Sequence, residues 1–505
     1  MQAVVELPKG KQPAGLRLRM HPFFFDILTT GLTQAAMLAA NLILVGAVSK
    51  QMGVPVLGEY LLVKRVSTWL LVGSQLGLGI ALPRQIAHTV VDVEARARQY
   101  FLAAFTVMLV FVTSVGLVAA LNAERVARWC LGSENRGLVY AMLLLLFGMA
   151  AQAAVFGYFR GLERVQMANL VALGGAAVVP LLALALTHRS RSAPILIGAT
   201  GLGLTVLSLL WAIPKIAALQ FSQRFISDAR ELLSYGVGRI PGDFAMGGLL
   251  ALGPMLVSHH VSIVQNSYLL LGITCMSMGG VAFAPVSMVL LARISRLLAA
   301  GRQGDVNEYI GHLRSAVLQL SLVLVVQGLI FARPLVLWWL GPSCVAGVPV
   351  IRMVMLAIPA YMYYAAFRSV VDAASPVAYN ARNLLIALAV LIAILVAVIC
   401  FVPQEKIVIA TAAATTVAMC VLAVATHVTL RALRLTDSVP QSGPLWLAGV
   451  LGITSLAAQL AFRFQITQLA FGLVLLLNFG LTFLFLRRSQ PEWLGFVLRV
   501  AFPRT

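Results

Sequence analysis

The chain has 505 residues, of which 60% are apolar and only 11% are charged, and its mean hydropathy is +0.94. An average soluble protein carries roughly 25% charged residues, so this composition excludes a soluble enzyme, a secreted disulfide scaffold and a disordered protein. It predicts an all-α polytopic membrane protein. The net charge of +20 would suggest nucleic-acid binding in a soluble protein. Membrane proteins concentrate Lys and Arg in cytoplasmic loops, so we expect no nucleic-acid partner here.

The first 22 residues are basic and lack the apolar core of a signal peptide, so we expect a cytoplasmic N-terminus. The stretch 244–292 is long enough for two helices, and Ser258-His259-His260 marks a short turn between them. We interpret 334–351 as a loop because glycines and prolines interrupt it. About 14 transmembrane helices follow from the uncharged stretches 27–49, 66–83, 99–123, 137–159, 165–188, 192–214, 244–292 (two helices), 315–332, 353–367, 383–404, 407–430, 438–462 and 464–486.

These spans predict two pseudo-symmetric six-helix bundles plus two C-terminal helices. Between the bundles, an amphipathic helix is expected to lie in the membrane interface, because its apolar residues fall near one helical face: Phe221, Phe225, Ala229 and Leu232. The predicted segments are a cytoplasmic N-terminal segment (1–22), an N-terminal lobe (23–216), an interfacial connector (217–233), a C-terminal lobe (234–431), transmembrane helices 13 and 14 (438–486) and a cytoplasmic tail (487–505).

Most of the 37 Lys and Arg residues fall in segments that this topology places in the cytoplasm, which supports the topology. Four basic residues remain inside or near the ends of spans: Lys64, Arg65, Arg239 and Arg352. A Lys or Arg at mid-membrane costs roughly 2.5–3.5 kcal/mol on insertion scales, so such residues persist where they face a wet cavity or a partner. For Arg352, near the outer end of span ten, we expect interfacial anchoring.

Span two, interpreted as 60–82, carries a polar stripe. Lys64, Thr68 and Gln75 fall within about 40° of one another around the helix, and Arg65 projects about 100° away. We take these four residues as candidate substrate-binding residues. Because both basic residues lie near the outer end of this span, snorkelling of their side chains to the interface is the alternative.

Span one carries Asp26, Thr30, Gln34 and Asn41 within an arc of about 80°. Gln34 and Asn41 are further candidate substrate-binding residues, with hydrogen bonding between helices as the alternative. Asp26 lies near the cytoplasmic end, where it either favours the positive end of the helix dipole or takes part in ion coupling.

Span seven begins with Arg239 and Asp243, which are four residues apart and can pair on one helical face. They form either a self-neutralised structural pair or an anion site, in which Arg239 binds substrate and Asp243 holds Arg239 in place or releases the anion when protonated. The intramembrane set carries an excess of positive charge. It suits an anionic headgroup such as phosphate or diphosphate and not a cationic drug, which would require buried carboxylates.

No nucleotide-binding, zinc-protease or serine-hydrolase motif is present, and the five cysteines lack metal-binding spacing. We therefore expect neither enzymatic activity nor a cofactor.

Three stretches of the sequence, taken in order, form a recognisable pattern: Leu57-Gly58-Glu59-Tyr60 with Gly77-Leu78 and Ala81-Leu82-Pro83-Arg84, then Tyr235-Gly236 with Arg239-Ile240-Pro241-Gly242-Asp243, then Leu340-Gly341-Pro342 with Val350-Ile351-Arg352 and Arg368-Ser369-Val370-Val371-Asp372-Ala373. Together they resemble the Wzx-like polysaccharide flippases of the MATE/flippase (MOP) superfamily, and the resemblance covers about residues 23–430. Lys64 and Arg65 depart from the usual apolar or hydroxylated start of span two in that family.

The resemblance implies a bacterial inner-membrane flippase that moves an undecaprenyl-diphosphate-linked oligosaccharide by alternating access, for surface polysaccharide synthesis or export. Spans one, two, seven and eight would line its central cavity. The implied partners are the lipid-linked glycan, membrane lipids, and polysaccharide polymerase and export proteins. The alternatives are a multidrug cation antiporter of the same superfamily, whose cavity should hold acidic residues, and a membrane glycan polymerase, which would need a long outer loop that this chain lacks.

Overall fold

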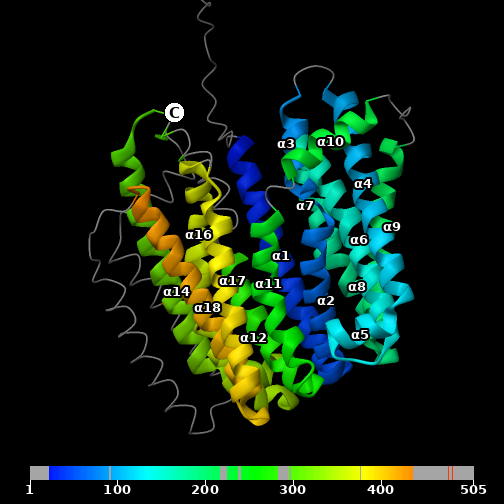
Figure 1. The fold of residues 1–505 in the computed structure, drawn as a ribbon, viewed down its shortest axis with the longest axis vertical. Helices are drawn as coiled ribbons and strands as arrows, with labels where there is room; N and C mark the ends of the chain where they lie inside the picture. Colours follow the sequence, from blue (N-terminus) through cyan, green and yellow to red (C-terminus); the bar gives the residue numbers. More distant parts are fainter. Residues whose placement is uncertain are drawn as a thin grey trace, which may run out of the picture.

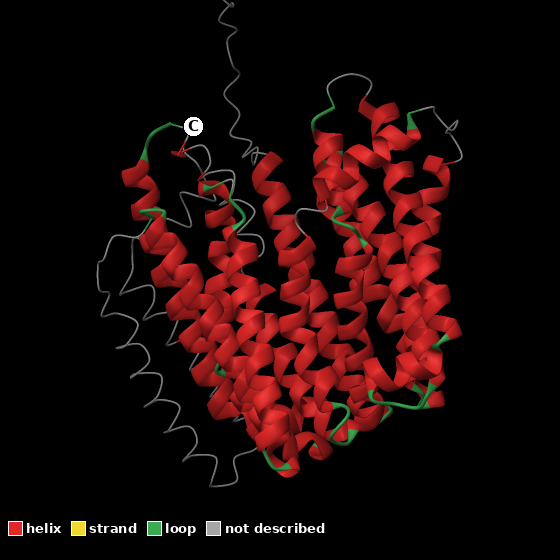
Figure 2. Ribbon diagram, in the orientation of Figure 1, coloured by secondary structure: helices red, strands yellow, loops and turns green. Residues whose placement is uncertain are grey.

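The computed structural model describes residues 22–89, 93–216, 224–236, 240–281, 300–375 and 377–435, together with the isolated residues 294, 297, 298, 476 and 480. Within these residues the chain is helical and contains no strand (Figure 2). Nine of the described helices are long and apolar enough to cross a membrane, or up to eleven if each of two bent pairs forms one span. The prediction of an all-α, multi-pass membrane protein is therefore confirmed. The count of 14 stays a prediction, because helices 13 and 14 fall outside the described residues apart from two isolated positions.

The first half of the chain packs into one group of helices, which we call the N-lobe (Figure 1). Helix α6 is its centre and contacts α2, α3, α4, α7 and α9. The N-lobe consists of α1 (Pro22–Gln51), α2 (Val54–Ser74), α3 (Leu78–Ala87), α4 (Val93–Leu121), α5 (Ala123–Leu131), α6 (Arg136–Gly161), α7 (Val165–Leu173), the π-helix η1 (Gly174–Val178), α8 (Val179–Thr187), the 3₁₀-helix η2 (His188–Ser190) and α9 (Ala193–Ile216).

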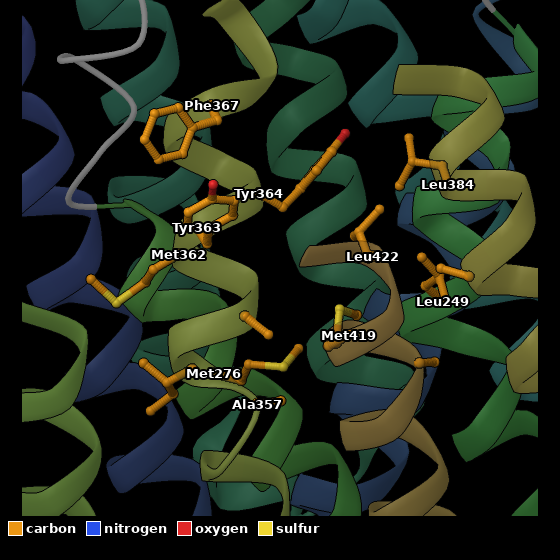
Figure 3. Packing of buried hydrophobic residues seen from close by; sticks show 14 of the residues in the cluster. Leu249, Met276, Ala357, Met362, Tyr363, Tyr364, Phe367, Leu384, Met419 and Leu422 are labelled. Atoms are coloured by element: carbon orange, nitrogen blue, oxygen red, sulfur yellow. The ribbon is translucent and has the colours of Figure 1, made fainter. Parts of the chain in front are cut away.

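The second half forms the C-lobe. Its core gathers large apolar side chains from α11, α12, α16, α17 and α18, among them Leu249, Met276, Phe367, Leu384 and Leu422 (Figure 3). The C-lobe consists of α11 (Ile240–Val257), α12 (Ile263–Val281), α14 (Gln303–Leu340), the 3₁₀-helix η4 (Pro342–Gly347), α15 (Val348–Met355), α16 (Ile358–Ala374), α17 (Tyr379–Phe401), the 3₁₀-helix η5 (Gln404–Lys406) and α18 (Ile407–Ala432).

Span two is broken where the sequence predicted one straight helix. It begins at Val54, directly after Gly53 and with Pro55 in its first turn, and α2 ends at Ser74. Gly77 then adopts a left-handed conformation (φ +74°), and α3 continues at 52° to α2. The helix therefore starts earlier and ends sooner than the predicted 60–82.

The loop predicted over 334–351 is wrong. Helix α14 continues to Leu340, and Gly341, with φ +95°, ends it. Pro342 then opens η4, and α15 follows from Val348 at 46° to α16. Proline is well tolerated in the first turn of a helix, because its missing N–H would have no partner there anyway. A proline that the sequence analysis took as a helix breaker marks a helix start.

The connector is a helix, α10 (Phe225–Gly236), which packs on α3 and α4 of the N-lobe. Its apolar face includes Leu232, which is fully buried. Asp228, at the edge of that face, is also buried and receives two hydrogen bonds from the Arg96 guanidinium, at 2.7 and 2.8 Å. Residues 217–223 of the predicted connector lie outside the described part of the chain.

Hydrogen bonds between α1 and α14 join the two lobes at the lower end of the molecule in Figure 1. We call this the tied end; it holds the α1–α2 turn and the α11–α12 turn. Ser49 Oγ donates to the Leu340 carbonyl at 2.8 Å, and Lys50 Nζ donates to the Trp338 carbonyl at 2.7 Å. In the opposite direction, Trp339 Nε1 donates to the Leu42 carbonyl of α1 at 2.7 Å.

Candidate functional site

A cavity of about 270 Å³ lies between the lobes. The N-lobe contributes α1, α2 and the π-helix η1 to its wall, and the C-lobe contributes α12. Its lining residues are Gln34, Met37, Leu38, Asn41, Leu61, Lys64, Arg65, Thr68, Ala176, Thr274, Ser277 and Met278. Five of the residues singled out from the sequence, from two different helices, therefore share one space: Gln34, Asn41, Lys64, Arg65 and Thr68.

Lys64 is the middle residue of α2, ten residues from either end, which corresponds to about 15 Å at 1.5 Å per residue. Its ammonium group donates to Asn41 Oδ1 of α1 at 3.0 Å and lies 5.7 Å from the centre of the Tyr60 ring. Lys64 therefore lines the cavity from the middle of α2 and bonds to a neighbouring helix. The snorkelling alternative rested on a helix start at residue 60, which the structure moves to Val54.

Arg65 lines the same cavity on the side nearer the C-lobe helix α16. Its guanidinium lies near the Tyr361 phenol of α16. Within the described part of the chain it forms no hydrogen bond or ion pair, and no carboxylate lies within ion-pair distance of Lys64 or Arg65. The cavity therefore carries two adjacent positive charges that no described acidic residue neutralises.

The hydroxyl groups that line the cavity already donate their protons to backbone carbonyls. Thr68 donates its hydroxyl proton to the Lys64 carbonyl at 2.7 Å, one turn back along α2. On α12, Thr274 and Ser277 donate to Leu270 and Ile273 carbonyls at 2.8 and 2.7 Å. These hydroxyls keep their oxygen lone pairs available as acceptors, so they suit the hydroxyl groups of a sugar better than they suit an anion.

A π-helical turn shapes the wall opposite α2. Where η1 begins, the Val171 carbonyl accepts from the Gly174 backbone N–H and also from the Gln152 side-chain amide of α6, the latter at 3.0 Å. A Cβ on Gly175 would overlap the Gln152 amide, so a larger residue there would displace that amide from the Val171 carbonyl. The bulge places Ala176 at the cavity, and π-bulges occur frequently at functional sites.

Tyr361 of α16 packs against the cavity helix α12 but does not line the cavity, and neither does Arg368. Tyr361 lies over Gly280 of α12, where a Cβ would overlap its ring, and it lies near both Arg65 and Arg368. Arg368 is exposed and two turns further along α16. The other tyrosines of this run behave as packing residues: Tyr363 and Tyr364 are buried in the C-lobe core, and Tyr363 bonds His427 at 2.9 Å. Spacing alone did not separate Tyr361 from its neighbours.

The other predicted residues lie elsewhere. Gln75 follows the last residue of α2 at the break, and its amide lies beside Gly79, away from the cavity lining. Asp26 is half-buried in the first turns of α1, and Asp243 is exposed in the first turn of α11. Arg239 lies outside the described residues. Arg352 is half-buried on α15.

Comparison with solved structures identifies the fold. No protein-family model and no curated protein matches the sequence. The chain is similar to the lipid II flippase MurJ in an inward closed conformation, with a TM-score of 0.65, 12% identity, and coverage of 93% of this chain and 99% of that one. It is similar to an inward-facing multidrug resistance MATE family transporter of the MOP superfamily (TM-score 0.61, 13% identity, coverage 81% and 99%). It is also similar to the MATE transporter VcmN of Vibrio cholerae (TM-score 0.57, 18% identity, coverage 82% and 98%). At these identities the likeness establishes the MOP-transporter fold and nothing finer.

Proposed function

We propose that this protein is a flippase that moves a lipid-linked oligosaccharide across the bacterial inner membrane, with undecaprenyl diphosphate as the lipid carrier. The observation that carries the proposal is the cavity between the lobes, where Lys64 and Arg65 lie in the middle of α2 without a described counter-charge. Burying two cations is costly unless an anion accompanies them. A diphosphate supplies that anion and gives Arg and Lys the acceptors that they bind best.

The mixed lining supports a substrate with a charged and an uncharged polar part. Lys64 and Arg65 would hold the diphosphate, while Thr274, Ser277 and Gln34 would accept or donate hydrogen bonds to sugar hydroxyls. The lipid tail would stay in the bilayer. Movement of the lobes about the cavity would expose it to either side in turn. Asp26 and Asp243 remain the candidates for coupling this movement to an ion gradient, with Arg239 as a further candidate for the diphosphate.

In this proposal both termini are cytoplasmic and the tied end faces outward. The protein would act beside the polymerase and export proteins that use its product. The MOP fold alone would equally suit a multidrug cation antiporter, such as the MATE transporters that share it. The cavity disfavours that alternative, because none of the described lining residues is acidic. A glycan polymerase stays a third candidate without a structural observation in its favour.

The test is binding of undecaprenyl diphosphate to the purified full-length protein in detergent, measured by native mass spectrometry. Lys64→Met and Arg65→Gln together remove two charge-assisted interactions, each worth about 1.5–3 kcal/mol. We expect the affinity to fall by roughly 100-fold or more, since about 1.4 kcal/mol corresponds to a tenfold change. The matched control is Arg189→Gln, an exposed arginine on η2, which should leave the affinity unchanged. Undiminished binding by a folded double variant would refute the proposal.

A further inference from the structure

A second and larger hollow lies at the tied end, on the outside of the helix bundle. It has a volume of about 680 Å³, within the roughly 300–1,000 Å³ of sites that bind small molecules. The N-lobe helix α5 forms one side, and the C-lobe helices α11 and α17 form the other. We call it the α5–α11–α17 groove; it is lined by Arg128, Trp129, Leu252, Met255, Leu256, His259, His260, Ile392, Leu395, Val396 and Ile399.

The walls of this groove are hydrocarbon along the two membrane-spanning helices. Ile392, Val396 and Ile399 run along α17 over two turns, about 10 Å of helix. Ile392 is 44% exposed and Val396 56% exposed. Branched apolar side chains open to the bilayer over this length offer a surface that an acyl chain can cover along its own axis.

The rim of the groove is polar and lies where the helices end. Arg128 is exposed in the last turn of α5 and forms no ion pair with any residue that the structure describes. Trp129 beside it is 78% exposed, and tryptophan favours the membrane interface, where its ring meets lipid and its N–H meets water. His259 and His260 complete the rim just beyond α11.

Backbone contacts hold this rim in place. His259 Nε2 lies 3.1 Å from the Trp129 carbonyl, and Gln404 Nε2 donates to the His260 carbonyl at 2.7 Å. None of the groove residues is acidic. Glu405 lines an adjoining hollow with the same two histidines, outside the groove.

From this arrangement we propose that the α5–α11–α17 groove binds an anionic membrane phospholipid. Its acyl chain would lie along α11 and α17, and Arg128 would bind its phosphate at the interface. The groove is separate from the cavity of Lys64 and Arg65, and its walls come from different helices. Binding here does not depend on the flippase proposal.

The groove joins two bodies that must separate if the tied end opens. A lipid seated in it contacts α5 of the N-lobe and both C-lobe helices, so it stabilises the state in which this end is closed. One consequence rests on the proposed function. If the protein is a flippase, the anionic lipid content of the outer leaflet would set how readily the tied end opens.

Quenching of tryptophan fluorescence by brominated lipids tests the binding step. The full-length protein is placed in nanodiscs with increasing mole fractions of phosphatidylglycerol or phosphatidylcholine that carry brominated acyl chains. Subtraction of the Trp129→Phe signal isolates Trp129. We expect half-maximal quenching at a mole fraction at least five times lower for phosphatidylglycerol than for phosphatidylcholine. Arg128→Gln should abolish this preference, and Arg125→Gln, which changes an exposed arginine of α5 that does not line the groove, should retain it.

Filling the groove with Val396→Phe provides a second variant that leaves the rim charge intact, and it should reduce quenching by both lipids. Thermal melting confirms that each variant is folded. Equal quenching by the two lipids in the unaltered protein overturns the proposal, as does an unchanged preference in Arg128→Gln. Displacement of phosphatidylglycerol by undecaprenyl diphosphate at equal mole fraction would assign the groove to the transported lipid instead. A dimer that Val396→Phe disrupts would assign it to a second copy of the chain.

Discussion

A single substitution can test whether the tied end opens during the protein's working cycle. Ser49 Oγ of α1 lies 3.4 Å from Cys344 Sγ of η4, in the other lobe, and both residues are buried. Ser49→Cys therefore places two sulfur atoms within a small side-chain movement of the 2.05 Å disulfide bond. With copper phenanthroline as oxidant, we expect an intramolecular cross-link between the lobes, detected by mass spectrometry of the linked peptides.

The expected effects differ between the reduced and oxidised forms. Three hydrogen bonds join α1 of the N-lobe to α14 of the C-lobe here, from Ser49, Lys50 and Trp339 to backbone carbonyls, and each contributes about 0.5–1.5 kcal/mol. The reduced variant loses the Ser49 bond, or about 1 kcal/mol, which shifts the closed-to-open ratio by roughly fivefold. The oxidised variant cannot open this end without breaking a covalent bond, so transport should stop.

Transport is followed in proteoliposomes with a fluorescent undecaprenyl-diphosphate-linked oligosaccharide, before and after reduction. Ser49→Cys combined with Cys344→Ala is the matched control, because oxidation should neither cross-link it nor stop it. Failure to cross-link would show that the two side chains are not adjacent. Full transport by a completely cross-linked protein would refute the idea that the tied end must open.

Two further predictions concern stability, measured by thermal unfolding in detergent. Gly77→Ala should lower the free energy of unfolding by at least about 2 kcal/mol, because the new Cβ would sit on a left-handed backbone and overlap the Gly236 carbonyl. The control is Gly301→Ala, at φ +69° with open space around it, which should lower the free energy of unfolding by only about 1–2 kcal/mol. Equal losses would show that the close approach to α10 is unimportant. Arg96→Met should lower the free energy of unfolding by about 3 kcal/mol, because it leaves the buried Asp228 carboxylate without its counter-charge. Adding Asp228→Leu should recover much of this loss. A double variant no more stable than Arg96→Met would contradict the reasoning.

The sequence was most informative where charged residues fall inside a predicted membrane-spanning helix. Lys64 and Arg65 stand out because charge is expensive at mid-membrane, and the helical period then links Lys64 to Thr68. The same period failed at Gln75, because it assumes one straight helix and the chain breaks at Gly77. The sequence alone does not distinguish a glycine that adopts a left-handed backbone from a glycine that only allows two helices to pack closely.

The helical period within one segment does not predict which residues of two different helices contact each other. Asn41 and Lys64 were both singled out from the sequence, yet only the packing of α1 on α2 shows that they bond to each other. Tyr361 differs from Tyr363 and Tyr364 in its burial and in its neighbours across the lobe boundary, which no local pattern encodes. The loop expected over 334–351 failed for a simpler reason, since proline both ends helices and begins them.

The π-turn at η1 changes how the whole span from Val165 to Ser190 has to be interpreted. It inserts the equivalent of one extra residue into a helix, so the residues beyond Val178 are rotated by about 100° relative to an uninterrupted α-helical count. Asn169, before the turn, bonds Thr30 of α1 at 3.2 Å, and a wheel drawn through to α8 would assign the wrong residues to that same face. A scan of solvent accessibility along this span should therefore show two periodic segments out of phase with each other, with the phase jump at 174–178. The extra residue therefore shifts by one position which residues of α8 face α1. Gly175 lies within this π-turn, where a Cβ would meet the Gln152 amide.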